Sequence, residues 1–502
     1  MKSLKKLHYK GYGGKMEQFK ILMVSAEVEP FAKTGGLADV AGALPKELKV
    51  MGHDVRIVMP RYQCISARMS YLTDFSVEML GKSETAIIRE GSLNFDENGE
   101  HYSIPVYFVD SYHYFDRSGI YCYPDDADRF CFFDKAVLKM LPKIGFKPDV
   151  IHCNDWQTGL VPVFLKNVFG QDPYYAGIKT VFSIHNMKFQ GRWMVQEVMD
   201  ITGLPASLFT NDKLESYGES NYLKGGCVYA DAVSTVSPSY ANDITTPEGG
   251  EGLGGLMYAR RNDLYGIVNG IDYDEFNPET DTTMTVNFSV ETVIEGKKAN
   301  KAALQREMGL PEKEDALLIG MVSRLTDQKG FDLVAYVMEE MLSTMNVQFV
   351  VLGTGEHRFE EMFHYFQGKY PDKISSYIGY SEEKAHRIYA SCDAFLMPSL
   401  FEPCGLSQMM SMRYATIPIV RETGGLKDTV APYNEFDGTG TGFSFAEYNA
   451  HDMLHIIQYA YDVFANRKDQ WHALMKRAMT TDYSWNASAR KYEELYNKLI
   501  GE

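Results

Sequence analysis

A loop with two glycines and a lysine, Lys33–Val40, has the residue types that hold phosphate groups. It follows the apolar run Ile21–Val24, which predicts a buried strand, and precedes a stretch that predicts a helix ending near Val50. This arrangement directs backbone N–H groups and the positive end of the helix dipole at a ligand, and Lys33 adds a full charge. A tight turn that merely needs two glycines explains the loop equally well. Pro45 inside the helix predicts a kink or a fresh helical start.

Two further loops resemble the first. Thr423–Thr429 repeats the pattern Thr-Gly-Gly-Leu-x-Asp after the apolar run Ile417–Val420. Ser323–Gly330 places Arg324 and Lys329 between a predicted strand and a predicted helix. Because such loops occur toward both ends of the chain, we expect two nucleotide-binding-type domains that face each other.

An acid follows another predicted strand. Glu402 comes shortly after Ala394–Met397, at what would be the carboxyl end of a parallel strand. A carboxylate there can bind sugar hydroxyls, offset charge on an oxocarbenium-like centre, or simply cap the next helix. Cys404 is interpreted as a packing residue rather than a nucleophile, because no histidine lies near it in the sequence. Cations and an acid in one cleft favour the departure of a diphosphate from a sugar.

Polar residues also follow the predicted strands Asp149–His152 and Lys179–Ile184, where Asp155 and His185 stand. We expect both near the ligand, since ligands bind at the carboxyl ends of strands in open α/β sheets. Two structural explanations compete: Asp155 caps the helix beginning near Thr158, and His185 satisfies a loop carbonyl.

The composition limits the class of protein. At 502 residues the chain is too long for one core, so we expect two domains. A hydrophobic content of 45% is typical of a globular protein, and no apolar run approaches the ~18 residues of a membrane helix. The net charge of −17 argues against non-specific nucleic-acid binding, so an anionic ligand would depend on local cations.

Cysteine usage and the N-terminus predict a cytoplasmic protein. The seven cysteines are odd in number and form no Cys-x-x-Cys pair, so neither a disulfide framework nor a zinc site is expected. The first twenty residues carry six lysines without an apolar core, which does not predict a secretory signal. Residues 1–15 are interpreted as a tail or an upstream start before Met16.

The sequence predicts neither a dinucleotide site nor a metal site. Gly353–Gly355 lacks the third glycine of a dinucleotide fingerprint, and no metal-ligand cluster is visible.

The order of predicted elements describes the rest of the chain. From residue 315 onward strands and helices alternate, which predicts βαβ units and a parallel sheet. Residues 60–125 predict loops with an antiparallel excursion, and 247–256, with five glycines, predicts a flexible loop or lid. Ile267–Asp272 would open the second domain, and Trp485–Ile500 predicts a helix with no strand after it.

Seven motifs in order resemble those of bacterial glycogen synthases and plant starch synthases, the nucleotide-sugar-dependent α-1,4-glucan synthases of glycosyltransferase family five. Together they extend over about residues 20–498 and are far more specific than one glycine-rich loop. The motifs are Lys33–Val40, His185-Asn186, Val268–Asp272, Ser323–Gly330, Gly379–Glu382, Phe401–Leu406 and Thr423–Leu426.

The resemblance implies the GT-B architecture, an α/β fold with two Rossmann-like parallel-sheet domains separated by a cleft. It also implies that the terminal helix crosses back onto the first domain. The expected parts are a tail (1–18), an acceptor-side domain (19–265), a nucleotide-sugar domain (266–482) and the crossing helix (483–502). Members transfer glucose from ADP-glucose to the non-reducing end of an α-1,4-glucan, retaining configuration, without a metal or other cofactor.

The resemblance also implies roles for individual residues. The implied catalytic residues are Glu402, His185 and Asp155. Glu402 would lie at the donor glucose, and Asp155 would contact the glucose or the acceptor. His185 would lie near the sugar's 6-hydroxyl, with its backbone carbonyl close to the reacting carbon. The expected substrate- and nucleotide-binding set contains Lys33, Gly35, Gly36, Asp39, Asn269, Arg324, Lys329, Tyr380, Cys404, Gly405, Thr423, Gly424 and Gly425. Within that set, Lys33, Gly36, Arg324 and Lys329 would hold the diphosphate, and Tyr380 would lie against the adenine.

Two positions depart from the family pattern. Asn154 stands where a histidine usually precedes the Asp-Trp pair, and Asp126 stands where asparagine is common. Three alternatives remain open: UDP-glucose as the donor, a sucrose- or trehalose-type synthase with a small acceptor, and a non-catalytic glucan-binding protein. The intact set of cations with Glu402 argues against the last, because carbohydrate binding alone needs no diphosphate site.

Overall fold

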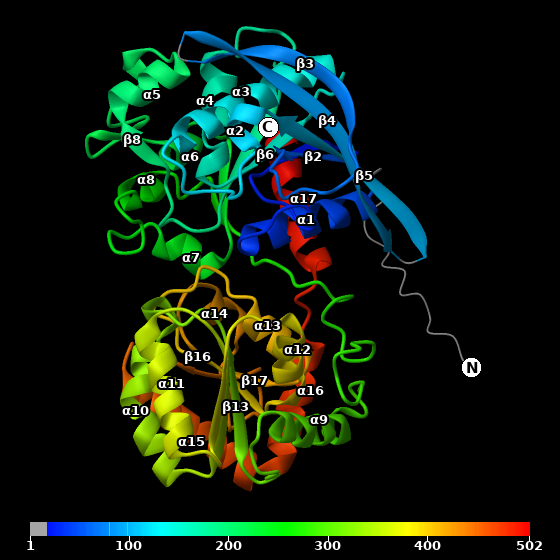
Figure 1. The fold of residues 1–502 in the computed structure, drawn as a ribbon, viewed down its shortest axis with the longest axis vertical. Helices are drawn as coiled ribbons and strands as arrows, with labels where there is room; N and C mark the ends of the chain where they lie inside the picture. The colour runs from blue at the N-terminus through cyan, green and yellow to red at the C-terminus, as the bar shows by residue number, and fades with distance from the viewer. Residues whose placement is uncertain (1–17, 80, 98, 502) are drawn as a thin grey trace.

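The computed structural model describes residues 18–79, 81–97 and 99–501, which form two α/β lobes stacked one above the other (Figure 1). Apart from residue 18, the predicted N-terminal tail lies outside the described residues. The upper lobe is built on a nine-stranded sheet and the lower lobe on a six-stranded sheet. The predicted α/β fold is confirmed, with one large sheet in each lobe.

The sheet of the upper lobe combines a parallel core with an antiparallel edge. Its strands, in spatial order, are β12 (Leu264–Gly266), β11 (Ala232–Thr235), β7 (Lys179–Ile184), β6 (Val150–Asn154), β1 (Lys20–Val24), β2 (Asp54–Pro60), β5 (Glu100–Asp110), β4 (Lys82–Glu97) and β3 (Ser70–Met79). All neighbours from β12 to β5 pair in parallel, whereas β4 pairs antiparallel with β5 and β3.

The antiparallel edge corrects part of the prediction for residues 60–125. The antiparallel excursion is confirmed, but three long strands replace most of the expected loops. Only one face of β3 is buried, through Phe75, Val77 and Met79, so polar residues dominate the rest of that strand.

Helices connect many of the strands of the upper lobe. They are α1 (Gly36–Val50), α2 (Tyr112–Phe115), α3 (Asp126–Lys143), α4 (Leu160–Asn167), α5 (Val195–Thr202), α6 (Tyr222–Tyr229), α7 (Pro238–Asp243) and α8 (Gly254–Ala259), with 3₁₀ turns η1 (Trp156–Thr158) and η2 (Ala206–Leu208). A small separate sheet contains β8 (Arg192–Met194), β10 (Glu219–Asn221) and β9 (Glu215–Ser216). Helix α1 is continuous through Pro45, so no fresh start occurs there.

The glycine-rich segment 247–256, which was predicted as a flexible loop or lid, contains tight turns and the start of α8. A Cβ at Gly254 would lie 2.2 Å from the Thr246 carbonyl oxygen, and one at Gly250 would lie 2.4 Å from the Gly254 Cα. Close packing of backbone segments therefore accounts for these glycines.

The lower lobe has the regular alternation that the sequence predicts from residue 315 onward. Its all-parallel sheet has the order β15 (Ile374–Ile378), β14 (Val347–Gly353), β13 (Leu317–Val322), β16 (Ala394–Met397), β17 (Ile417–Arg421) and β18 (Phe443–Phe445). The helices are α9 (Val293–Glu307), α10 (Phe331–Thr344), α11 (His357–Lys369), α12 (Glu382–Ser391), α13 (Ser407–Arg413), α14 (Gly424–Thr429), α15 (Ala450–Asn466) and α16 (Lys468–Thr480), with the 3₁₀ turn η3 (Asp327–Lys329). In Figure 1, α10, α11 and α15 lie on one side of this sheet and α9, α12 and α16 on the other.

The last helix, α17 (Trp485–Gly501), lies in the upper lobe beside α1, although it follows the lower lobe in sequence (Figure 1). The chain crosses between the lobes twice, and the two crossings lie side by side, since Ile271 N–H donates to the Tyr483 carbonyl at 2.8 Å. Gly270 is required there, because a Cβ would lie 2.4 Å from the Trp485 nitrogen. The domain boundaries at 265/266 and 482/483 stay predictions.

Helix α17 is fixed to the upper sheet by a buried polar contact. The Tyr496 hydroxyl lies 2.7 Å from His152 Nδ1, and Ser183 bonds the other ring nitrogen. Burial lowers the pKa of His152 to about 3, so the ring is neutral and uses both nitrogens in hydrogen bonds.

We expect Tyr496→Phe to lower the free energy of unfolding by about 1–2 kcal/mol, because it leaves a buried ring nitrogen of His152 without its partner. Urea unfolding followed by circular dichroism measures this. Tyr336→Phe, at a tyrosine that is 72% exposed, is the matched control. Equal stability of both variants would show that the contact does not hold α17.

None of the helices in the described part of the chain combines the length and apolar character needed to cross a membrane.

Candidate active site

The two lobes touch where α7 of the upper lobe meets the Glu402 segment and α14 of the lower lobe (Figure 1). Ser237, at the N-cap of α7, donates its hydroxyl to the Pro403 carbonyl at 2.7 Å. Ser239 donates its N–H and its hydroxyl to Asp428 on α14, each at 2.7 Å. The segment that carries the predicted catalytic acid is therefore attached to the opposite lobe.

Lys33 lies in the loop between β1 and α1 and contacts an acid of that loop and an acid in the first turn of α1. Its ammonium donates to Asp39 at 2.6 Å and lies 3.8 Å from Glu29. Burial lowers the pKa of Lys33, but the hydrogen bond and charge of Asp39, with smaller contributions from Glu29 and Glu275, raise it overall. Lys33 is therefore a cation at neutral pH, and Asp39 is its partner here.

The glycines of this loop are not explained by packing. A Cβ at Gly35 or Gly36 would meet no atom within 4 Å, and neither residue has positive φ. No side chain caps the N-terminus of α1, a helix of 15 residues. A turn that merely needs glycine is therefore not supported, and the free space above the loop suits a ligand that approaches the backbone.

The second Thr-Gly-Gly loop has a different explanation. Gly424 has a φ of +45°, and its Cβ would lie 2.1 Å from the Glu402 carbonyl oxygen. A Cβ at Gly425 would lie 2.1 Å from the Cys404 carbonyl oxygen, and its N–H donates to the Glu402 carbonyl at 3.0 Å. The Gly424 N–H donates to Asp243. These glycines let α14 pack closely against the segment that carries Glu402.

Lys329 and Glu402 form an ion pair at the carboxyl edge of the lower sheet. The ammonium donates to Glu402 Oε2 at 2.6 Å, and the Ser399 hydroxyl donates to the same oxygen at 3.1 Å. Glu402 is only 7% exposed and does not cap α13, so the capping alternative is wrong. Arg324 lies on the same loop as Lys329, is exposed, and has no side-chain hydrogen bond or ion pair to any residue that the structure describes.

Asp155 and His185 lie together at the carboxyl edge of the upper sheet. The Asp155 carboxylate accepts the backbone N–H of His185 at 2.7 Å and that of Asn186. Burial raises the pKa of Asp155 to about 7, although the two hydrogen bonds from backbone N–H groups lower it. Its φ of +57° is a strained conformation for a residue with a side chain. The carboxylate fixes the His185 loop and does not cap η1, so the capping alternative is wrong.

The imidazole of His185 bonds a side chain and not a loop carbonyl. Its Nε2 lies 3.0 Å from Asn154 Oδ1. Burial lowers the pKa of His185 to about 4, so the ring is neutral at physiological pH. The alternative in which His185 satisfies a loop carbonyl is therefore wrong.

The remaining predicted residues vary in accessibility. The side-chain oxygen of Asn269 is buried and has no hydrogen-bond partner in the described part of the chain, as expected of a group that awaits a ligand. Tyr380 is 85% exposed, so its ring is free to stack.

Cys404 is buried, which raises its pKa to about 12 and excludes a thiolate nucleophile at neutral pH. Gly405 has a φ of +69°, which favours glycine.

Sequence reasoning missed Glu27. Its carboxylate accepts the N–H and, at 2.8 Å, the hydroxyl of Thr34, and the hydroxyl of Tyr121 at 2.6 Å. Glu27 therefore holds the loop of Lys33 in place. Its position just after β1, at the carboxyl end of a parallel strand, was the available signal.

The second departure from the family pattern, Asp126, has a structural role. Its carboxylate accepts from the buried guanidinium of Arg129 and from the Cys122 N–H, the latter at 2.9 Å. The acid balances a buried cation at the start of α3.

Three potential metal ligands converge that no sequence spacing predicted. Glu275, Glu382 and His386 each bring one ligand atom within 4.8 Å of the others in the described part of the chain. Burial, followed by a hydrogen bond with Glu382, raises the pKa of Glu275 to about 7. The ring of His386 donates to Asp281 at 2.8 Å. The two carboxyl groups of this cluster are therefore hydrogen-bonded to each other.

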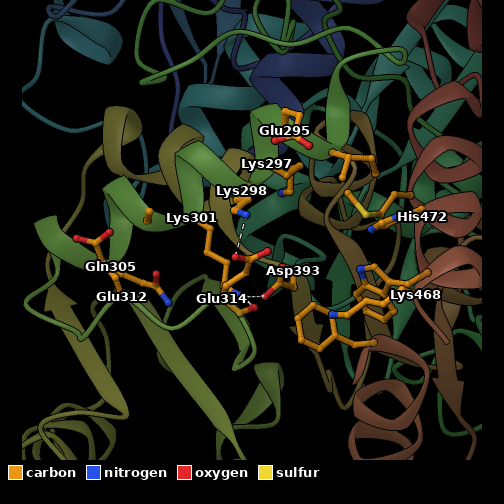
Figure 2. Close-up of a pocket in the computed structure, with 15 residues that line it drawn as sticks. Glu295, Lys297, Lys298, Lys301, Gln305, Glu312, Glu314, Asp393, Lys468 and His472 are labelled. Carbon is orange, nitrogen blue, oxygen red and sulfur yellow. Dashed lines mark hydrogen bonds and ion pairs between the residues drawn. The ribbon is translucent and has the colours of Figure 1, made fainter. Parts of the chain in front are cut away.

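A cavity of about 580 Å³ lies away from the lobe boundary, between α9 and α16 of the lower lobe (Figure 2). Two of its lysines are paired: Lys298 with Glu314 at 2.9 Å and Lys301 with Asp393 at 2.7 Å, as the dashed lines in Figure 2 mark. Lys297 donates to three oxygens of the surrounding protein. These contacts give the buried lysines a structural role.

Family models and curated relatives match both lobes. A model described as the starch synthase catalytic domain matches residues 20–259, and one described as glycosyl transferases group 1 matches residues 305–469. A protein named glycogen synthase from Lachnospira eligens is 56% identical over 484 residues, which cover 95% of this chain and 99% of the relative. Another glycogen synthase, from Lachnoclostridium phytofermentans, is 50% identical and covers 96% of this chain and 100% of the relative.

Solved structures share the arrangement of the two lobes. The catalytic domain of starch synthase IV from Arabidopsis thaliana, bound to ADP and acarbose, has a TM-score of 0.87 and 32% identity, covering 97% of this chain and 100% of that chain. Sucrose-phosphate synthase from Thermosynechococcus elongatus has a TM-score of 0.57 at 15% identity, covering 97% of this chain and 100% of that one, which shows a shared fold alone. The chain therefore belongs to the glycogen and starch synthase family of hexosyltransferases and has the GT-B fold.

Proposed function

We propose that this protein is a glycogen synthase that transfers glucose from ADP-glucose to the non-reducing end of an α-1,4-glucan, with retention of configuration. The observation that carries the proposal is the ion pair at 2.6 Å between the partly buried Lys329 and the buried Glu402, on a segment that α7 of the other lobe contacts. The relatives named glycogen synthase and the starch synthase structure with bound ADP support this assignment.

The diphosphate of the donor would bind between the lobes. Lys33 and the open backbone at Gly35 and Gly36 would contribute from above, and Arg324 and Lys329 from below. Charge-assisted hydrogen bonds to the departing diphosphate strengthen as negative charge develops on it, so they lower the barrier. Because the two halves of this site lie on different lobes, closure of the lobes is part of the proposal.

Glu402 would stabilise the transferred glucose. The bond between the anomeric carbon and the diphosphate breaks, and its electron pair leaves with the diphosphate. The acceptor's 4-hydroxyl attacks the same face, and its proton passes to a diphosphate oxygen. Glu402 balances the positive charge of the oxocarbenium-like centre. A single acid suffices, because the leaving group acts as the base, whereas a retaining glycosidase uses two carboxyl groups.

The other predicted residues would orient the donor and acceptor. Asp155 binds the His185 loop, and the carbonyl and ring of His185 would face the glucose. The unpaired amide oxygen of Asn269 would accept from the donor, and the exposed ring of Tyr380 would stack on the adenine. Cys404, Gly405, Thr423, Gly424 and Gly425 would shape the same wall, and Asp39 would keep Lys33 in place.

A donor competition assay tests the proposal. ADP-glucose and UDP-glucose are offered together with glycogen, and each released nucleoside diphosphate is quantified. We expect ADP release coupled to chain elongation to dominate. Glucosyl transfer to free glucose or fructose but not to glycogen would overturn the glycogen synthase assignment. Absence of turnover with any nucleotide sugar would overturn the enzymatic proposal.

Lys33→Ala should weaken ADP binding by about 10- to 100-fold, since a charged hydrogen bond to phosphate contributes about 1.5–3 kcal/mol. Isothermal titration calorimetry with ADP measures the affinity. Lys369→Ala is the control, since that lysine pairs with Glu339 on the surface of the lower lobe. An unchanged ADP affinity in Lys33→Ala would remove this lysine from the diphosphate site.

We also propose a cytoplasmic location. All seven cysteines are free, and five of them are buried, as in proteins of reducing compartments.

A further inference from the structure

The side chain of Asn154 has only one orientation that satisfies its surroundings. Its Nδ2 lies 3.0 Å from the Val24 carbonyl oxygen and 3.1 Å from the Met23 sulfur, and both atoms can only accept hydrogen bonds. A flipped amide would place its oxygen against the Val24 carbonyl oxygen, where neither atom could donate a hydrogen bond. Asn154 is also fully buried. The amide nitrogen therefore points at β1, and the amide oxygen points at His185.

This orientation decides which nitrogen of His185 carries the proton. Oδ1 of Asn154 can only accept, and it lies 3.0 Å from His185 Nε2, so Nε2 must be the N–H donor. In a neutral imidazole the other nitrogen, Nδ1, then has a free lone pair. Nδ1 has no hydrogen-bond partner among the residues that the structure describes, and the His185 side chain is partly exposed.

We propose that Asn154 is a positioning residue that keeps His185 in its Nε2–H form, so that Nδ1 faces the substrate as a hydrogen-bond acceptor. The placement of substrate beside His185 rests on the proposed function, whereas the proton position rests on the contacts of Asn154 alone. The ligand group that fits Nδ1 is a hydroxyl of the transferred sugar, which donates its hydrogen. A donor that lacks this hydroxyl would leave Nδ1 unpaired and be disfavoured.

The surroundings support a neutral ring. Burial lowers the pKa of His185 to about 4, and none of the described acids forms a salt bridge with its ring. Asp155 binds the backbone N–H of His185 and not the imidazole. His152, on the neighbouring strand, is also neutral, because burial lowers its pKa to about 3.

Proton placement can be measured without turnover. Protein labelled with ¹⁵N-histidine is examined by long-range ¹H–¹⁵N correlation at pH 7.5, and His185→Gln assigns the signal. The wild type should show the Nε2–H tautomer. An Nδ1–H tautomer in the wild type would overturn the proposal, and this measurement needs no variant of Asn154.

Two substitutions then test the role of Asn154. Asn154→Leu removes the acceptor, so we expect a mixture of tautomers and a fall in kcat of about 10- to 100-fold with unchanged ADP affinity. Burial favours the carboxylic acid form in Asn154→Asp, whose O–H can donate to the Val24 carbonyl while its C=O accepts from Nε2, so the proton should stay on Nε2. A wild-type tautomer and wild-type kcat in folded Asn154→Leu would overturn the proposal. Failure of the proposed function would appear separately, as absence of glucosyl transfer by the wild type.

Discussion

Glu402→Gln should lower kcat for glucosyl transfer to glycogen by about 100- to 1000-fold while ADP affinity changes by less than about threefold. The amide has nearly the shape of the carboxylate but no charge, so it cannot balance the positive centre. Its carbonyl oxygen can still accept from Lys329 and Ser399, which now bond one carboxylate oxygen. The expected loss therefore lies in the chemical step and not in donor binding.

ADP release with saturating ADP-glucose and glycogen measures kcat, and calorimetry with ADP measures binding. Glu339→Gln is the matched control, because Glu339 pairs with Lys369 on the surface of the same lobe. Turnover of Glu402→Gln within a factor of three of the wild type would remove this acid from the mechanism. An equal loss in Glu339→Gln would show that any lost carboxylate in this lobe impairs the enzyme.

Lys329→Met should reduce both kcat/KM and stability. Removal of a cation at the diphosphate should lower kcat/KM by about 100- to 1000-fold. It also leaves the Glu402 carboxylate, which is 7% exposed, without its ion-pair partner. Removal of one partner of a buried ion pair costs about 3–5 kcal/mol of the free energy of unfolding. Because this edge of the lower sheet is partly hydrated, we expect a loss near the lower end of that range.

The double variant Lys329→Met/Glu402→Gln separates the two effects. The free energy of unfolding should recover by about 1–3 kcal/mol relative to Lys329→Met, because no buried charge remains unpaired, while activity stays low. Lys369→Met, which breaks an exposed pair, should cost less than about 1 kcal/mol. Additive stability losses in the double variant would show that Lys329 and Glu402 do not interact energetically.

Much of the fold follows from local patterns. The alternation of buried strands with amphipathic helices after residue 315 predicts the parallel sheet, because the period of apolar residues reflects the face that each element buries. In 60–125 the same patterns predicted the antiparallel excursion but not the length of its strands, because β3 buries only one face and polar residues dominate the rest of it. At Pro45 the predicted fresh helical start does not occur, because α1 continues through this residue.

The candidate site was predicted as a set of residue types and not as a set of contacts. Local sequence locates Lys33, Glu402 and His185 at the carboxyl ends of strands, where parallel sheets bind ligands. The local sequence predicts the same phosphate-binding role for both Thr-Gly-Gly loops. In the structure, however, Gly35 faces open space and Gly424 packs against a carbonyl.

By itself, then, the sequence determined the two-lobed α/β architecture, the family, and the residue types at the strand ends. Only the tertiary structure decided their partners: Glu402 for Lys329, Asn154 for His185, and Tyr496 for His152. These pairs are separated by 73, 31 and 344 residues. The physical reason is that a hydrogen bond depends on positions within about 3 Å, which the stacking of distant strands and helices fixes and which no local periodicity encodes.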